Sequence, residues 1–169
     1  MRLSATDLEH LRRAVALARL ALERGDEPFG SVLVSGSGEV LFEDHNHVVA
    51  LEGTQHPEFA IARWAGGSLT AEERAAATVY TSGEHCAMCS AAHGWVGLGP
   101  IVYAVSSRQL DRWRRDWGAG PSPVVTFGVN DESCGWIRIP TKELDRLLRP
   151  ITVAERPSML GRLKEAIGV

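Results

Sequence analysis

Apolar residues recur at helical spacing over the first part of the chain. Between residues 4 and 25 an apolar side chain stands at every third or fourth position, which is typical of an amphipathic helix. Thr6 and Glu9 fit a capping box at its start, and Gly25 fits its C-terminal end. The apolar positions are Leu8, Leu11, Val15, Ala18 and Leu22. The sequence therefore predicts a helix over residues 4–25.

Short β-type runs follow this helix and then alternate with helical spacing. Residues 29–35 and 40–43 flank a Gly-Ser-Gly turn, which predicts a β-hairpin. The elements expected after the hairpin are helices at 56–64, 71–76 and 86–96, strands at 78–82 and 100–105, and a charged helical stretch at 108–115. We expect Gly66 and Gly67 to end the first of these helices.

The alternation of strands and helices predicts an α/β fold. Parallel strands are joined by crossover helices in such folds, and the hairpin adds an antiparallel edge. A chain of 169 residues with 44% hydrophobic content can bury one core but is too short for two ordinary domains, so we expect a single domain over residues 1–169. Beyond residue 118 the pattern weakens. Residues 124–129 and 136–139 fit short strands or an ordered loop, and residues 154–167 fit a last helix.

Charge and hydropathy argue against several classes of protein. The net charge of -3, with acids and bases interspersed, argues against a protein that wraps a long polyanion. No stretch approaches the ~18 apolar residues that cross a bilayer, and the residues after Met1 lack the layout of a secretory signal. We therefore expect a cytoplasmic protein with no membrane partner.

Two of the three cysteines, Cys86 and Cys89, stand at Cys-x-x-Cys spacing, which in a reducing compartment indicates metal or redox chemistry. His56 and this pair each stand at the start of a predicted helix, so we expect the two helix starts to meet at one end of the sheet. One imidazole and two thiolates suit tetrahedral zinc with an open fourth position, which favours catalysis. A structural zinc needs a fourth ligand, and His85, the nearest candidate, is poorly placed because it directly precedes Cys86.

Glu58 lies two residues after His56. At this spacing a carboxylate can reach a water molecule at the open position without binding the metal itself. That is the place of a general acid and base that shuttles protons. The combination of His-x-Glu with a later Cys-x-x-Cys is the signature of zinc deaminases.

Three stretches carry a resemblance to a known family: PFGSVLV at 28–34, HPE at 56–58 and YTSGEHCAMC at 80–89. With them, residues 25–105 resemble the cytidine deaminase-like superfamily, more closely the branch that holds bacterial guanine deaminases, fungal-type cytosine deaminases and tRNA adenosine deaminases. The resemblance implies a three-layer α/β/α fold with a central mixed five-stranded sheet, a Zn2+ cofactor and a homodimer. The family usually has alanine and proline where this chain has Pro57 and His85.

The resemblance also suggests which residues bind substrate. The candidates are Phe29, Asn46, Pro57, Glu84, Trp113 and Asp116. Phe29 is either a core strand residue or a ring that stacks on substrate, and Asn46 either bonds its own turn or bonds the substrate ring. Trp113 packs in the core or caps the pocket, and Asp116 is the nearest match to an acidic residue that reads the purine edge in guanine deaminases. His45 and His47 are expected to be solvated loop residues.

We expect hydrolytic deamination of a free nucleobase or a similar small aminated heterocycle, guanine-like, cytosine-like or a triazine, with release of ammonia. The alternative is a tRNA adenosine-to-inosine deaminase. Arg108, Arg112 and Arg115 share a helical face, but Asp111 and Asp116 interrupt the charge, so binding of nucleic acid is not favoured. A non-enzymatic scaffold is a third possibility, against which the intact glutamate of the HPE motif argues.

The last expectations concern assembly. The helix at 86–96 is rich in small residues, which allow a second subunit to approach closely, so we expect a homodimer. Residues 119–169 carry more apolar surface than a free tail exposes. We therefore expect them to form a C-terminal extension that packs on the pocket or on a partner subunit. The resemblance to guanine deaminases implies that this segment crosses to the partner's active site.

Overall fold

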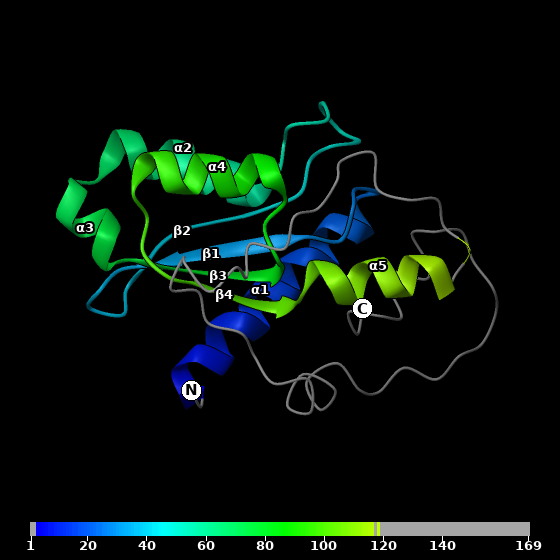
Figure 1. Ribbon diagram of the computed structural model, residues 1–169, viewed down its shortest axis with the longest axis horizontal. Coiled ribbons are helices and arrows are strands. Elements are labelled where there is room, and N and C mark those ends of the chain that lie inside the picture. Colours follow the sequence, from blue (N-terminus) through cyan, green and yellow to red (C-terminus); the bar gives the residue numbers. More distant parts are fainter. Residues whose placement is uncertain (1–2, 117, 119–169) are drawn as a thin grey trace.

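The computed structural model describes residues 3–116 and residue 118. Helices and strands follow one another along this part of the chain as the hydrophobic pattern predicts (Figure 1). The elements are α1 Ala5–Glu23, β1 Gly30–Val34, β2 Val40–His45, α2 Pro57–Ser68, α3 Ala71–Ala76, β3 Thr78–Gly83, α4 Ala87–Val96, β4 Ile101–Val105 and α5 Ser107–Asp116. The elements expected at 124–129, 136–139 and 154–167, and the extension over 119–169, lie outside the described residues.

The strands form one mixed sheet in the order β2-β1-β3-β4. Strand β1 pairs antiparallel with both β2 and β3, whereas β3 and β4 are parallel and joined through α4. The expected hairpin edge and parallel crossover are therefore confirmed. The described residues supply four of the five strands that the family resemblance implies.

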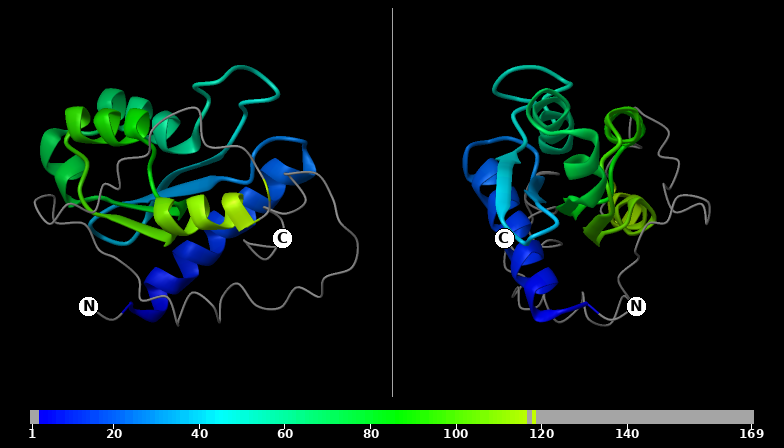
Figure 2. Two further views of the ribbon diagram at one scale, coloured as in Figure 1. Left: turned by 45° about the vertical axis from the view of Figure 1, so that its right-hand side comes forward. Right: turned by 90° about the vertical axis from the view of Figure 1, so that its left-hand side faces the viewer.

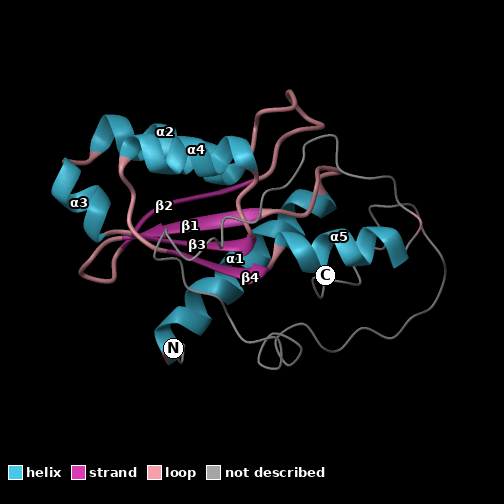
Figure 3. Ribbon diagram, viewed as in Figure 1, coloured by secondary structure: helices cyan, strands magenta, loops and turns pink. Residues whose placement is uncertain are grey.

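Helices cover both faces of this sheet (Figures 2 and 3). Helix α1 and the apolar side of α5 pack on one face, and α2 packs on the other beside α4. The expected three-layer arrangement is confirmed.

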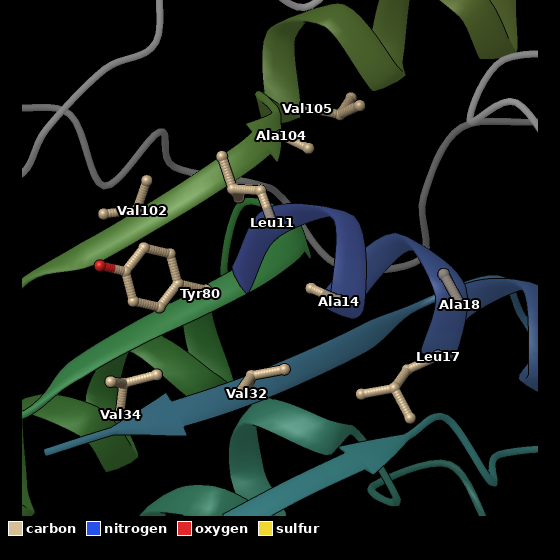
Figure 4. Packing of buried hydrophobic residues seen from close by; sticks show 10 residues of the cluster. All are labelled: Leu11, Ala14, Leu17, Ala18, Val32, Val34, Tyr80, Val102, Ala104 and Val105. Carbon is tan, nitrogen blue, oxygen red and sulfur yellow. The ribbon is translucent and has the colours of Figure 1, made fainter. Parts of the chain in front are cut away.

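Alternate strand residues supply the two cores, because successive side chains of a strand point to opposite faces. Val32, Tyr80 and Val102 face α1, where Leu11 and Ala14 pack against the sheet (Figure 4). On the other face the packed residues are Leu33, Ile61, Ala65, Ala77, Val79, Ile101 and Tyr103. Burial on both faces explains why these strands read as continuous apolar runs.

The capping box of α1 differs from the predicted one. Ser4, not Thr6, is the N-cap residue, and its Oγ accepts from the N–H of Asp7 at 3.0 Å while Asp7 accepts from the Ser4 N–H at 2.7 Å. Asp7 is fixed in turn by the hydroxyl of Tyr80, which donates to it at 2.6 Å. The sequence offers two capping pairs of the same spacing, Ser4 with Asp7 and Thr6 with Glu9. The contact of Asp7 with the sheet favours the first pair. Gly25 follows the helix with φ of 90°, as expected for its end.

Helix α2 does not end at Gly66 and Gly67 as predicted but continues to Ser68. A Cβ at position 66 would lie 3.2 Å from Val96 Cγ1 of α4, tighter than ordinary contact. Glycine therefore lets the two helices approach closely. That packing outweighs the cost of about 1 kcal/mol for glycine within a helix.

Candidate active site

Helices α2 and α4 begin above the same end of the sheet (Figure 1). His56 is the N-cap residue of α2 and Cys86 that of α4. His56 Nδ1 lies 3.7 Å from Cys86 Sγ and 3.6 Å from Cys89 Sγ. The meeting of the two helix starts is therefore as expected.

These distances fit a zinc ion. Zinc bonds of about 2.0 Å to nitrogen and about 2.3 Å to sulfur at a tetrahedral angle place the two ligand atoms about 3.5 Å apart. His56, Cys86 and Cys89 are a group whose ligand atoms all lie within 4.8 Å, and the described residues add no fourth His, Cys, Asp or Glu to it. Three ligands leave one position for water, which is the arrangement of catalytic zinc.

The electrostatics of the cluster also favour a cation. A hydrogen bond from Cys89 lowers the pKa of Cys86 to about 4, and the positive end of the α4 dipole acts in the same direction. The hydrogen bond with Cys86 raises the pKa of His56. The hydrogen bond to Cys86 and burial raise the pKa of Cys89. A metal ion takes the place of these shared protons.

Glu58 lies in the first turn of α2, and its side chain is only 5% exposed. Its Oε1 accepts from Ser31 Oγ at 3.0 Å and from Thr81 Oγ1 at 2.8 Å. Its Oε2 lies on the metal-ligand side, 3.8 Å from Cys89 Sγ. Burial raises the pKa of Glu58. The carboxyl group can therefore hold or pass a proton beside the metal ligands.

Ser31 and Thr81 escaped the sequence analysis. Both are fully buried: Ser31 is the one hydroxyl residue of β1, and Thr81 stands in β3 beside the further hydroxyl residues Thr78 and Ser82. Buried polar side chains almost always have a partner, so a hydroxyl in each of two buried strands was the signal that could have found them.

Asn46 fills the first of the two roles considered for it, that of holding its own turn, while bonding of the substrate ring stays a prediction. Its Oδ1 accepts from the N–H of Val48 at 2.9 Å, which holds the turn after β2, and its own N–H donates to the carbonyl of Phe29 at 2.9 Å. The side chain is fully buried, yet its Nδ2 has no hydrogen-bond partner among the described residues. Both donors of this amide group are therefore free to bond a ligand.

Two further substrate-binding candidates belong to the same end of the sheet. The ring of Phe29 occupies the space that a side chain at Gly83 would need, with Cε1 3.0 Å from a Cβ built there. Pro57 is the buried first residue of α2, where proline costs no helical hydrogen bond. The contacts of these residues with substrate stay predictions.

The other three candidates have different surroundings. Glu84 Oε2 accepts from the N–H of Ser107 at 2.7 Å, which ties the start of α5 to the loop after β3. Trp113 packs against the core under α1, on the sheet face opposite to α2, and Asp116 is exposed at the end of α5. For Trp113 the described contacts favour the core role. A role in binding substrate stays a prediction for all three.

His85, which replaces the usual proline of the family, is buried against α4. Its ring lies edge-on to that of His93, with 5.3 Å between the centroids. Burial lowers the pKa of His85 well below its usual value, so the ring is neutral. Its ring is not part of the three-ligand group, which agrees with its exclusion as a fourth zinc ligand.

A second cluster of potential ligands, Asp44, His45 and His47, stands at the end of β2. His45 is buried within the strand end and is not the solvated loop residue that was expected. Its Nε2 lies 2.8 Å from Arg24 Nη1, and its Nδ1 lies 3.0 Å from the carbonyl oxygen of Asn46. The guanidinium can only donate, so it occupies the lone pair that a metal would need.

Comparison with known proteins agrees with this chemistry. Residues 4–105 match the family described as the cytidine and deoxycytidylate deaminase zinc-binding region. The probable cytosine deaminase of Schizosaccharomyces pombe is 34% identical over 121 residues, which make up 70% of this chain and 72% of the relative. The tRNA-specific adenosine deaminase of Agrobacterium fabrum is 35% identical over 91 residues, 53% of this chain and 59% of that relative.

The fold is also similar to that of a solved deaminase. The crystal structure of guanine deaminase from Bacillus subtilis superposes with a TM-score of 0.54 at 26% identity, covering 82% of this chain and 89% of that one.

Among the described residues, no helix combines the length and the apolar character that crossing a membrane requires. The chain belongs to the cytidine and deoxycytidylate deaminase family and is a zinc-binding hydrolytic deaminase that acts on a C–N bond.

Proposed function

We propose that the protein deaminates a free nucleobase or a similar small aminated heterocycle. His56, Cys86 and Cys89 hold the zinc ion, and Glu58 transfers the protons. The observation that carries the proposal is the position of Glu58 Oε2, buried beside the metal ligands at 3.8 Å from Cys89 Sγ. An aminated ring and water react to give the oxo ring and ammonia.

The chemistry needs a proton acceptor that later becomes a donor. Zinc, when bound, makes water nucleophilic near neutral pH. Glu58 takes a proton from the attacking water and delivers protons to the ring nitrogen and to the departing amino group. Burial raises the pKa of Glu58, so this carboxyl group holds the transferred proton more readily than an exposed one would.

The ring is held by side chains at the same end of the sheet. Asn46 donates from Nδ2 to an acceptor atom on the ring edge, since this buried amide nitrogen has no partner among the described residues. Phe29 stacks on the ring, and Pro57 forms a stiff wall beside it. Glu84, Trp113 and Asp116 are weaker candidates, because their described surroundings do not require a ligand.

A small substrate fits this chain better than a tRNA loop. Arg108, Arg112 and Arg115 on α5 are exposed, but acidic residues interrupt them, and the whole chain carries a net charge of -3. RNA-binding surfaces are usually basic and rich in exposed aromatic side chains. The relative named as a tRNA-specific adenosine deaminase keeps tRNA adenosine-to-inosine deamination as the second candidate.

The proposal includes a homodimer in the cytoplasm. Helix α4 presents Trp95 with 90% exposure, together with the exposed small residues Ala91 and Gly94. An exposed tryptophan beside small residues suits a closely packed subunit interface.

We further propose that residues 119–169 complete the pocket of the same subunit or of its partner. Deleting residues 151–169 is expected to abolish activity while zinc stays bound, and full activity of a truncated monomer contradicts both ideas.

One experiment tests the substrate class. Zinc-loaded protein is assayed for ammonia release from guanine, cytosine, adenine and an aminotriazine, with Glu58→Gln as the matched control of much lower activity. Turnover of at least one ring by the wild type, at a rate far above that of the variant, is the expected result. The absence of ammonia from the whole panel, combined with tight and salt-sensitive binding of tRNA in a gel-shift assay, would reverse the order of the two candidates.

A further inference from the structure

Two buried hydroxyl groups stand behind Glu58 as a cross-strand pair. Ser31 of β1 and Thr81 of β3 are directly opposite each other in the antiparallel register, and both are fully buried. They lie on the sheet face that carries Leu33 and Val79, which packs against α2. Their oxygens are 2.8 Å apart. A polar pair thus interrupts an otherwise apolar face directly below the start of α2.

The hydrogen-bond geometry gives this pair one carboxylate partner. Glu58 Oε1 lies 3.0 Å from Ser31 Oγ and 2.8 Å from Thr81 Oγ1. Each hydroxyl has one proton to donate. Ser31 can donate to Glu58 or to Thr81, and Thr81 can donate to Glu58 or to the carbonyl of Gly83 at 3.0 Å. A chain from Ser31 through Thr81 to Oε1 satisfies all three side chains.

This contact distinguishes the two oxygens of the carboxylate. Oε1 is held by the sheet, whereas Oε2 is left on the side of the metal ligands, where Cys89 Sγ lies 3.8 Å away. Without the two hydroxyls, the carboxyl group could rotate about its terminal bond, because that torsion is broad and roughly two-fold. A misplacement of about 1 Å in a reacting group can cost about 100-fold in rate.

We propose that Ser31 and Thr81 are positioning residues that fix Glu58 through Oε1, so that Oε2 faces the reacting atoms. This inference rests on the proposed role of Glu58 in proton transfer. The pair acts through Glu58, the one carboxylate among its described hydrogen-bond partners. Burying two hydroxyls is costly unless they are hydrogen-bonded, and the chain from Ser31 through Thr81 to Glu58 Oε1 provides these bonds.

The test uses variants that keep the shape of the core. Ser31→Ala and Thr81→Val are each expected to lower kcat by about tenfold, and the double variant by about 100-fold, with KM and zinc content unchanged. Thr81→Ser keeps the hydroxyl and is expected to keep kcat near that of the wild type. Ser82→Ala is the matched control, because Ser82 is equally buried but its Oγ accepts from the N–H of Gly30 at 3.1 Å and does not contact Glu58.

Two further readouts separate positioning from a merely structural role. In a Glu58→Gln background, adding Ser31→Ala and Thr81→Val is expected to cause no further loss of kcat, since the pair acts through that carboxylate. Crystal structures of the wild type and the double variant are expected to show the Glu58 carboxyl group rotated only in the variant. This structural readout holds even if the wild type deaminates none of the rings tested. An unmoved carboxyl group, or an unchanged kcat in the double variant, overturns the proposal.

Discussion

The cluster of His56, Cys86 and Cys89 and the cluster of Asp44, His45 and His47 each bring three potential metal ligands within 4.8 Å. Both stand near the same end of the sheet. In the first, His56 Nδ1 lies beside the two sulfurs and has no other hydrogen-bond partner among the described residues, and the start of helix α4 favours the thiolate form of Cys86. In the second, a guanidinium already donates to His45 Nε2, and His47 Nε2 lies 2.9 Å from Asp44 Oδ1.

The difference shows that ligand type alone does not make a metal site. A ligand must offer a free lone pair, and charges nearby must favour a cation. The permanently charged Arg24 beside His45 opposes a second cation. The thiol of Cys86 beside His56 has the opposite effect, because its lowered pKa allows a negative charge.

The largest expected effect comes from removing a ligand of the first cluster. Cys89→Ala is expected to release the zinc and abolish deaminase activity, because two remaining ligands bind the metal too weakly. Metal analysis by mass spectrometry, together with the ammonia assay, measures both effects. Treatment of the wild type with a chelator is expected to reproduce the loss, and added zinc to reverse it. Retention of one zinc per chain in the variant would show that the metal is bound elsewhere.

Glu58→Gln is expected to leave the metal in place but lower kcat by about 10²–10⁴-fold, the range typical of a general acid and base. Glutamine keeps the shape of the side chain and can still accept from Thr81, so folding is preserved. Zinc content and the melting temperature are the controls. Equal kcat in variant and wild type would remove Glu58 from the mechanism.

Arg24→Ala is expected to free the ligands of the second cluster. Without the guanidinium, His45 Nε2 can offer its lone pair, and the ring is already oriented by its contact with the carbonyl of Asn46 at 3.0 Å. The variant is expected to bind a second equivalent of zinc, more weakly than the first. Isothermal titration of zinc into both proteins measures this. Identical titrations would mean that the guanidinium is not what excludes the metal.

The smallest effect is expected from removing the histidines of the second cluster in the wild-type background. His45→Gln and His47→Gln should each leave one zinc per chain, because neither ring contacts the first cluster in the described contacts. A modest rise in KM is expected for His45→Gln, since its Nδ1 helps to hold the backbone of Asn46. Loss of zinc in either variant would contradict the distinction between the clusters.

The sequence pattern was sufficient for most of the fold and for the metal ligands. Short apolar runs between helical segments predicted the strands, because such runs depend on local periodicity. The places of His56, Cys86 and Cys89 at predicted helix starts predicted that the three side chains meet. Where prediction failed, a contact distant in sequence decided. Tyr80 selects the capping pair of α1, and Val96 explains why α2 continues through Gly66.

The surroundings of the site were harder to predict than its ligands. The link between Ser31 and Thr81 depends on the register of two strands 50 residues apart in sequence, which periodicity does not specify. The same holds for Arg24 and His45, whose contact joins the end of α1 to the end of β2. For residues 119–169 the predicted elements and their packing stay predictions.

The close approach of α2 and α4 at Gly66 has a consequence for how the protein acquires its metal. The two helices that carry the ligands are held together by their own packing, 3.2 Å from a Cβ at position 66 to Val96 Cγ1. We therefore expect the two helix starts, which carry the ligands, to keep their spacing before an ion binds. A metal ion would then bind to a site that is already folded. Which divalent ion occupies the site would depend on the competition among the ions in its surroundings.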